Sequence, residues 1–260
     1  MSLRIIEWTS FLKNSFSQST AITIGVFDGV HLGHQELISR IVCKGPNPTV
    51  VTFRESPKKV IFQRKGKANE YEGDIFSLKQ KLNTFESLGV QQVVLIDFSE
   101  NFSKLQGKEF IDLLEKHGKM SFLAIGSNFR CGYRKDADAE NIRKMYEGKG
   151  IPTEVVPRVT AGGEPISSSR IRATIVKGNL AEAAALMGRN FELDLSDLEP
   201  GSADHLVYDL LSVQRIVPPD GSYPVLLYPG AVKSQANVEN GKINLPGILS
   251  KDPESLDFLY

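Results

Sequence analysis

The first 190 residues alternate between short apolar runs and longer segments in which apolar residues recur at helical spacing. Residues 21–24 form an apolar, β-branched run, which is typical of a strand buried on both faces of a parallel sheet. Gly25 and Gly29 interrupt this pattern, and residues 35–42 continue with apolar residues spaced as in a helix. The pattern therefore predicts a strand, a tight glycine turn and a helix.

The remaining elements of this region are predicted in the same way. The N-terminal residues 1–20 read as an edge strand or entry segment, and the polar residues 58–74 as a mobile loop over the edge of the sheet. Further strands are predicted at residues 48–53, 90–96, 121–126 and 151–156, and helices at residues 77–88, 107–117 and 136–145. Strands joined by helices favour an α/β fold with a Rossmann-like, doubly wound parallel sheet.

The pattern changes after residue 190. Residues 217–228 and 232–244 contain short strand candidates, and Asn240-Gly241 is a strong hairpin-turn signal. The sequence therefore predicts a small, mostly-β C-terminal domain, whose core is marginal by itself because it has fewer than about 70–80 residues.

Composition excludes several function classes. The 260 residues carry 31 basic and 31 acidic side chains, so no net charge favours nucleic acid or a membrane surface as a partner. Hydrophobic residues make up 41% of the chain, which is enough for a core, and they are too evenly spread for a membrane span. Only Cys43 and Cys131 are present, so we expect a reducing, cytoplasmic location and no zinc site.

Two histidines open the helix that follows the glycine turn. His31 and His34 are three residues apart, so both side chains are expected on one face, at the positive end of the helix. Such an end binds phosphate, and two imidazoles add donors for charge that grows on a phosphate during attack. A surface or capping role is the alternative for histidines at helical spacing. The preceding strand and glycines favour a phosphate site, and Gly33 keeps side-chain bulk away from the approaching phosphate.

Residues 25–34, with the sequence GVFDGVHLGH, resemble the nucleotidyltransferase signature that ends in histidine-x-glycine-histidine. The sequence of this segment is similar to that of the corresponding segment in the bacterial FAD synthetases, the bifunctional riboflavin kinase/FMN adenylyltransferases. The resemblance implies that His31 and His34 are catalytic. It also implies an ATP pocket shaped by Gly25, Phe27, Asp28, Gly29 and Gly33.

A second motif follows the strand predicted at residues 121–126. Residues 126–132, GSNFRCG, resemble the FAD synthetase segment Gly-x-(Asp or Asn)-Phe-x-Phe-Gly, which implies FMN binding by Asn128 and Phe129. An amide can bond a ring edge or phosphate, and an aromatic ring can lie on a planar ligand. A turn asparagine and a core phenylalanine are the alternative. Cys131 replaces the second aromatic residue, and Arg54 stands where the family usually has an acidic residue.

A third motif, ISSSRIR at residues 166–172, places three hydroxyls before a helix with an arginine behind them. Ordinary helix capping is the alternative, but such donors with a fixed cation also form a phosphate cradle. The segment resembles the (Ile/Val)-Ser-Ser-Thr-x-x-Arg motif of the nucleotidyltransferase superfamily. That resemblance implies ATP binding by Ser167, Ser168 and Ser169 and a catalytic role for Arg172. The acidic residues 136–140 suggest either capping of the next helix or a metal site, and capping is favoured.

The resemblance implies a nucleotidyltransferase domain at residues 1–190 and a shortened relative of the riboflavin kinase barrel at residues 191–260. The kinase segment Gly-x-Pro-Thr-Ala-Asn is absent from residues 192–260, so no kinase activity is expected. The expected reaction is transfer of AMP from ATP to FMN, giving FAD and pyrophosphate. Mg²⁺ is expected with ATP, metal-ligating residues are not identified, and the sequence leaves the oligomeric state open.

Two alternatives remain. Another nucleotidyltransferase could share the motifs and use a different acceptor, such as nicotinamide mononucleotide, phosphopantetheine or glycerol phosphate. A non-catalytic flavin or nucleotide sensor is the second alternative, which Arg54, Cys131 and the missing kinase segment leave open.

Overall fold

The computed structural model describes residues 2–201, 206–246 and 252–260. The chain divides into two compact units. Unit 1 comprises Met1–Ile61 and Leu82–Pro165, and unit 2 comprises Phe62–Lys81 and Ile166–Tyr260. Within the described ranges, no helix is both long and apolar enough to span a lipid bilayer.

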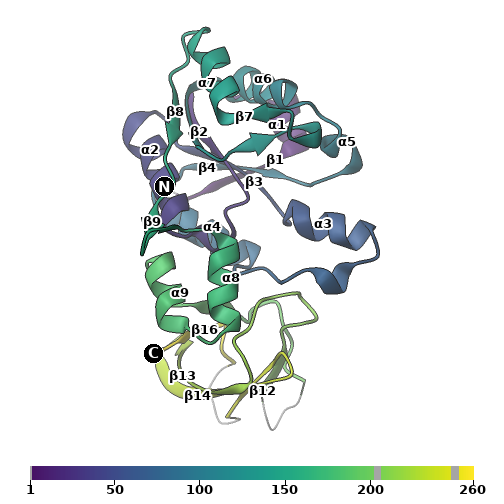
Figure 1. Cartoon of the computed structure of the whole chain (residues 1–260), viewed down its shortest axis with the longest axis vertical. Coiled ribbons are helices and arrows are strands. Elements are labelled where there is room, and N and C mark those ends of the chain that lie inside the picture. The colour runs from purple at the N-terminus through teal and green to yellow at the C-terminus, as the bar shows by residue number, and fades with distance from the viewer. Residues whose placement is uncertain (1, 202–205, 247–251) are drawn as a thin grey trace. The chain divides into compact units, whose positions relative to one another are not determined.

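Unit 1 is built on a six-stranded, fully parallel sheet (Figure 1). In spatial order the strands are β1 (Arg4–Glu7), β4 (Gln92–Ile96), β3 (Thr49–Phe53), β2 (Thr20–Ile24), β5 (Met120–Gly126) and β8 (Thr153–Val156). The α/β parallel sheet predicted from the sequence is therefore confirmed, and the N-terminal segment contributes its edge strand.

Helices cover both faces of this sheet. The main core on one face joins alternate strand residues such as Ile22 and Ile24 to side chains from α1 (Trp8–Lys13), α6 (Gly107–Gly118) and α7 (Ala139–Glu147). On the opposite face lie α2 (Leu32–Lys44) and the unit-1 part of α4 (Leu78–Ser87) (Figure 1). Both faces of the central strands are thus buried, which explains their continuous apolar runs.

Shorter elements complete unit 1. The helix α5 (Glu100–Ser103) precedes α6, the strands β6 (Arg130–Cys131) and β7 (Ala137–Asp138) form one small hairpin, and β9 (Thr160–Ala161) and β10 (Glu164–Pro165) form another.

Unit 2 contains a six-stranded antiparallel sheet and the helices α8 (Ser168–Val176) and α9 (Leu180–Met187). The strands, in spatial order, are β11 (Glu192–Asp194), β16 (Ser255–Phe258), β13 (Gly221–Tyr228), β14 (Val232–Glu239), β15 (Lys242–Leu245) and β12 (Leu206–Asp209). The hairpin predicted at Asn240-Gly241 is confirmed. Both residues have positive φ, 51° and 73°, as a two-residue turn between β14 and β15 requires.

The structure corrects the prediction of a loop at residues 58–74. A helix, α3 (Pro57–Arg64), begins at a proline and is followed by a 3-10 turn at Ala68–Glu70. Proline suits the first position of a helix because that N–H has no partner within the helix. None of the α3 side chains is fully buried. A helix with no buried face does not need apolar residues at helical spacing, and this spacing is the pattern from which a helix is predicted.

The compact units divide the chain differently from the predicted domains. The boundary falls at residues 165/166 and not at 190/191, and residues 62–81 join unit 2 although they lie early in the sequence. Backbone hydrogen bonds explain this membership. The N–H of Asp74 donates to the carbonyl of Gln214 (2.8 Å), and the N–H of Ile216 donates to the carbonyl of Asp74 (3.0 Å). The assignment of a transferase part to residues 1–190 stays a prediction about function.

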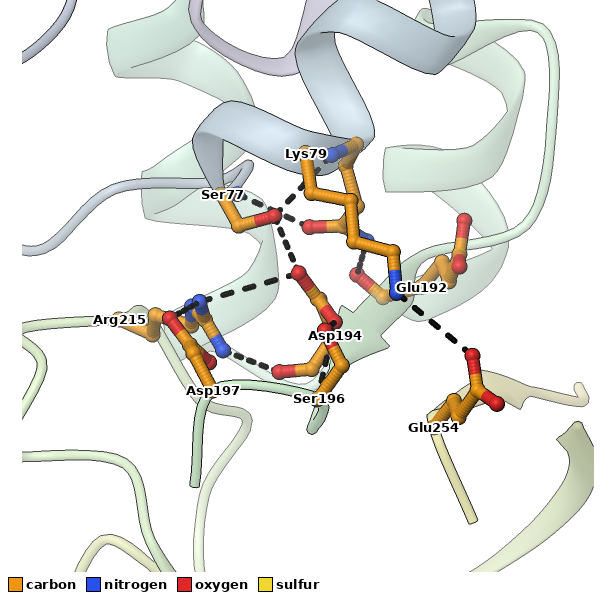
Figure 2. A network of polar contacts seen from close by, with 9 residues as sticks. Ser77, Lys79, Glu192, Asp194, Ser196, Asp197, Arg215 and Glu254 are labelled. Carbon is orange, nitrogen blue, oxygen red and sulfur yellow. Dashed lines mark hydrogen bonds and ion pairs between the residues drawn. The ribbon is translucent and has the colours of Figure 1, made fainter.

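A buried polar network reinforces that attachment (Figure 2). The Asp194 carboxylate, 3% exposed, accepts hydrogen bonds from the Ser77 hydroxyl (2.5 Å) and from the backbone and hydroxyl of Ser196 (3.0 and 2.7 Å). Arg215 donates to the Asp194 carbonyl and pairs with Asp197 at 2.6 Å. Burial alone would raise the pKa of Asp194, but these hydrogen bonds and the charge of Arg215 hold that pKa below its ordinary value.

We therefore expect Asp194→Asn to flatten the acid dependence of stability. A carboxyl whose pKa is lower in the folded than in the unfolded chain stabilises the fold above about pH 4, and this contribution is lost as the pH falls through the folded pKa. The original chain should lose more unfolding free energy than the variant between about pH 6 and about pH 3. Urea unfolding at the two pH values measures this loss, and equal losses would contradict the role given to Asp194.

Candidate functional site

The turn between β2 and α2 has a backbone that few side chains tolerate. Phe27 has a φ of 55° and Gly29 a φ of 72°. The Phe27 ring is completely buried and packs edge-on against Phe85 at 5.5 Å between centroids. A Cβ added to Gly25 would lie 3.1 Å from the Phe27 ring. The two predicted glycines thus permit the bend, and Phe27 anchors it in the core.

This bend delivers the two histidines to the N-terminus of α2. The rings of His31 and His34 are stacked, with centroids 3.6 Å apart and an interplanar angle of 17°. The prediction that both side chains point the same way is confirmed. His31 is the N-cap residue, and its carbonyl accepts the N–H of His34 at 2.7 Å. His34 also packs edge-on against Phe27 at 5.1 Å, so the buried phenylalanine supports the histidine pair.

Gly33 lies directly beside this pair. A Cβ at this position would lie 3.3 Å from Cε1 and Nδ1 of the His31 ring. Such a contact is tight enough to shift the ring by a few tenths of an ångström. Asp28, which is only 6% exposed, lies in the short 3-10 turn Asp28–Val30 just before α2. The motif therefore forms one packed structure around the two imidazoles.

The strand order explains why a ligand would bind here. From β2 the chain continues to β3 and β4 on one side of the sheet, then crosses back to β5 and β8 on the other. Ligands of open α/β sheets bind at such a switch point, beyond the carboxyl ends of the strands. Because β2 and β5 are parallel neighbours, the histidine turn and the loop after β5 leave the sheet at the same edge.

The loop after β5 carries the predicted FMN-binding pair. Asn128 is exposed, whereas Phe129 is half-buried and packs against the main core of unit 1, as its structural alternative predicts. Cys131 packs there too, and burial, together with the charge of Asp136, raises its pKa to about 12. Its thiol is thus neutral near pH 7 and is unsuited to act as a nucleophile.

The serine and arginine motif belongs to unit 2. Ser167 caps α8, because its hydroxyl accepts the N–H of Arg170 at 3.2 Å. The helix capping that the sequence also indicated is therefore observed at Ser167. Ser168 and Ser169 follow it in the first turn of the helix. Arg172 is 9% exposed, and its Nε donates to the carbonyl of Gly73 at 2.7 Å.

No pattern in the sequence indicated the contact between Arg172 and Gly73. It joins residues 99 positions apart, and Gly73 falls in the segment predicted as a loop. An isolated glycine between Glu72 and Asp74 was the only local signal.

The family departure at position 54 has a structural explanation. Arg54 pairs with Glu7 at 2.7 Å and with Asp97 at 3.0 Å, and the Glu7 hydrogen bond is the largest contribution that raises its pKa. A surface ion-pair network therefore accounts for this arginine.

The acidic cluster at residues 136–140 caps helices. Asp138 accepts the N–H of Asn141 at 2.9 Å, and Asp136 accepts the N–H of Gly107 at the start of α6 at 3.0 Å. The predicted capping of the helix that follows is therefore confirmed for Asp138. Among the described residues, no group of three or more histidine, cysteine or carboxylate side chains could hold a metal ion.

Comparison with known proteins gives consistent matches. Residues 13–170 match the family model for FAD synthetase. The chain is 30% identical over 196 residues to the bifunctional riboflavin kinase/FMN adenylyltransferase of Escherichia coli K12, covering 74% of this chain and 61% of that protein. It is 29% identical over 249 residues to the protein of the same name from Bacillus subtilis 168, covering 90% and 75%. The chain thus spans 61% of the length of the first curated relatives that it matches.

A solved structure shows the same fold. The crystal structure titled macrolide-efflux protein from Streptococcus pneumoniae superposes with a TM-score of 0.80 at 23% sequence identity. The match covers 98% of this chain and 89% of that chain, so the fold of both units has a counterpart in that structure.

Proposed function

The chain belongs to the FAD synthetase family, and on that premise we propose that it is an FMN adenylyltransferase, which transfers AMP from ATP to FMN and releases pyrophosphate. The observation that carries the proposal is the stacked pair His31 and His34 at the N-terminus of α2, beside the switch point of a parallel sheet. An oriented helix terminus and two imidazoles suit a reaction in which negative charge grows on a phosphate.

In the proposed reaction an FMN phosphate oxygen attacks the α-phosphorus of ATP. The new P–O bond forms as the bond between the α-phosphorus and the bridging oxygen to the β-phosphate breaks, and pyrophosphate leaves with that oxygen. His31 and His34 stabilise the charge around the α-phosphate and the leaving group. No covalent nucleophile is needed, because such transfers depend mainly on positioning and electrostatics.

The other predicted residues bind substrates in this proposal. Arg172 neutralises the β- and γ-phosphates, and Asn128 and Phe129 place FMN. The nucleotide pocket is assigned to Gly25, Phe27, Asp28, Gly29 and Gly33, and the phosphate cradle to Ser167, Ser168 and Ser169. Mg²⁺ would be held mainly by the phosphates of ATP and would neutralise part of their negative charge.

Further parts of the proposal concern the whole chain. Residues 1–190 supply the transferase chemistry, and residues 191–260 lack riboflavin kinase activity. Cys43 and Cys131 are free thiols in the structure, which fits the expected cytoplasmic location.

A panel of acceptors tests the proposed function. The chain is incubated with ATP or CTP and, in turn, riboflavin, FMN, nicotinamide mononucleotide, phosphopantetheine or glycerol phosphate, and pyrophosphate release is measured. We expect release with ATP and FMN only, and no FMN from riboflavin. Release with another acceptor would favour a different nucleotidyltransferase, and tight FMN binding without release would favour a sensor.

We expect Gly33→Ala to separate activity from stability. The helical backbone accepts alanine, which is favoured over glycine by roughly 1 kcal/mol in a helix, so the melting temperature should not fall. The added Cβ displaces the His31 ring by a few tenths of an ångström. FAD formation should therefore fall about tenfold, because small misplacements of catalytic groups are costly.

The matched control for this substitution is Gly148→Ala. A Cβ at Gly148 would make only ordinary contacts, 3.4 Å from the Lys144 carbonyl. This variant should keep full activity. Unchanged activity in Gly33→Ala would show that the His31 ring position is not critical.

A further inference from the structure

A backbone carbonyl of unit 2 holds the Arg172 side chain. The Arg172 Nε donates to the Gly73 carbonyl at 2.7 Å, which fixes the orientation of the guanidinium plane. Gly73 has a φ of 96°, and a Cβ there would lie 2.8 Å from the backbone nitrogen of Ile216. Only glycine allows this approach. The carbonyl that orients Arg172 is therefore placed by close packing against residues 215 and 216.

The packing at Gly73 is itself secured by the C-terminal sheet. Asp74 exchanges backbone hydrogen bonds with Gln214 and Ile216, so the Gly73 peptide follows the position of Arg215. Arg215 is 5% exposed and donates to the carbonyl of Asp194, the last residue of β11. Figure 2 shows that the Asp194 carboxylate also binds Ser77, which lies on the same segment as Gly73.

These contacts connect the C-terminal sheet to Gly73 and, through the Gly73 carbonyl, to Arg172. The hydrogen bond between Ser77 and Asp194 links the Gly73 segment to the sheet a second time. A buried network whose members are all satisfied is rigid, and its disturbance is felt at each connected group. We propose that Gly73, Asp194 and Arg215 are positioning residues, through which the C-terminal sheet sets the geometry of Arg172. The inference rests on the proposed function, because it assigns Arg172 to the phosphates of ATP.

A double-mutant cycle between Asp194→Asn and Arg172→Ala tests this inference. We measure kcat/KM for ATP in FAD formation and, by calorimetry, the affinity for ATP with Mg²⁺. Groups in one network are commonly coupled, so Asp194→Asn should lower kcat/KM about tenfold when Arg172 is present. It should change kcat/KM less than about twofold when Arg172 is already alanine.

Equal losses in both backgrounds would overturn the inference, since a general loss of structure acts whether or not Arg172 is present. Melting curves establish that each variant is folded at the assay temperature. Should Asp194→Asn not fold, Ser77→Ala replaces it in the cycle, with an expected loss of about threefold. This substitution removes one hydrogen bond to the same carboxylate and the acceptor of the Gln80 N–H.

The matched control is Asp257→Asn. Asp257 is a half-buried carboxyl on β16, outside the path to Arg172. In both backgrounds this variant should change kcat/KM by less than about twofold. That is about the change expected of a site that is not coupled to Arg172. If the original chain makes no FAD, the proposed function fails, and the calorimetric cycle still decides the inference. Equal affinity changes with and without Arg172, or no ATP binding by the original chain, would overturn it.

Discussion

Replacing His34 with alanine is expected to lower the rate of FAD formation by about 100- to 1,000-fold, the usual effect of removing one donor aimed at developing charge. The imidazole stacks on His31 at 3.6 Å between ring centroids at the positive end of α2, so its loss removes one of two paired donors. His31→Ala should have an effect of the same order. Turnover is measured as FAD produced per chain at saturating ATP and FMN.

His117→Ala is the matched control. This histidine lies in the last turn of α6 and contacts the Ser15 hydroxyl through Nδ1 at 3.1 Å. It belongs to unit 1, as His31 and His34 do, but is outside the motif, so its loss should leave turnover near the original value. Near-normal turnover in the His34 or His31 variant, with folding intact, would contradict the assigned roles.

Arg172→Ala is expected to give the second large effect, a loss in kcat/KM for ATP of about 100-fold or more. Truncating one partner of a buried charge pair commonly costs 2–5 kcal/mol. The side chain is 9% exposed, so its charge acts with little screening by water. Steady-state kinetics with varied ATP measure the loss.

The neighbouring arginine provides the comparison. Arg170 lies on the same helix and pairs with Glu182 at 3.1 Å. Arg170→Ala should change kcat/KM by only about a few-fold, because a partly exposed ion pair contributes little. An Arg172→Ala variant that binds and uses ATP like the Arg170 variant would exclude Arg172 from the phosphate site.

The fold of unit 1 could be predicted because the sequence patterns that indicate its strands, helices and turns are local. Strands buried on both faces give continuous apolar runs, and the glycine turn between β2 and α2 is set by adjacent residues. The Asn240-Gly241 hairpin was predictable for the same reason, since the turn needs positive φ at both positions. The prediction that His31 and His34 lie on one face followed from their helical spacing alone.

Features that depend on distant contacts could not be predicted. The helix α3 buries no residue completely, so the pattern of its sequence resembles that of a solvent-exposed loop. Residues 62–81 join unit 2 through bonds to residue 214 and beyond, and no local pattern encodes such pairing. For the same reason the serine motif indicated a phosphate cradle or a cap, but not that Gly73 orients Arg172.

Transfer of label from ATP to FMN would show directly whether the chain is an FMN adenylyltransferase. The chain is incubated with FMN and ATP that carries a radioactive α-phosphate, and the flavins are separated and counted. We expect label in FAD, in amounts equal to the pyrophosphate released, and no labelled flavin from ATP that carries the label on the γ-phosphate. Bound FMN that acquires no label, while ATP stays intact, would contradict the proposed transfer.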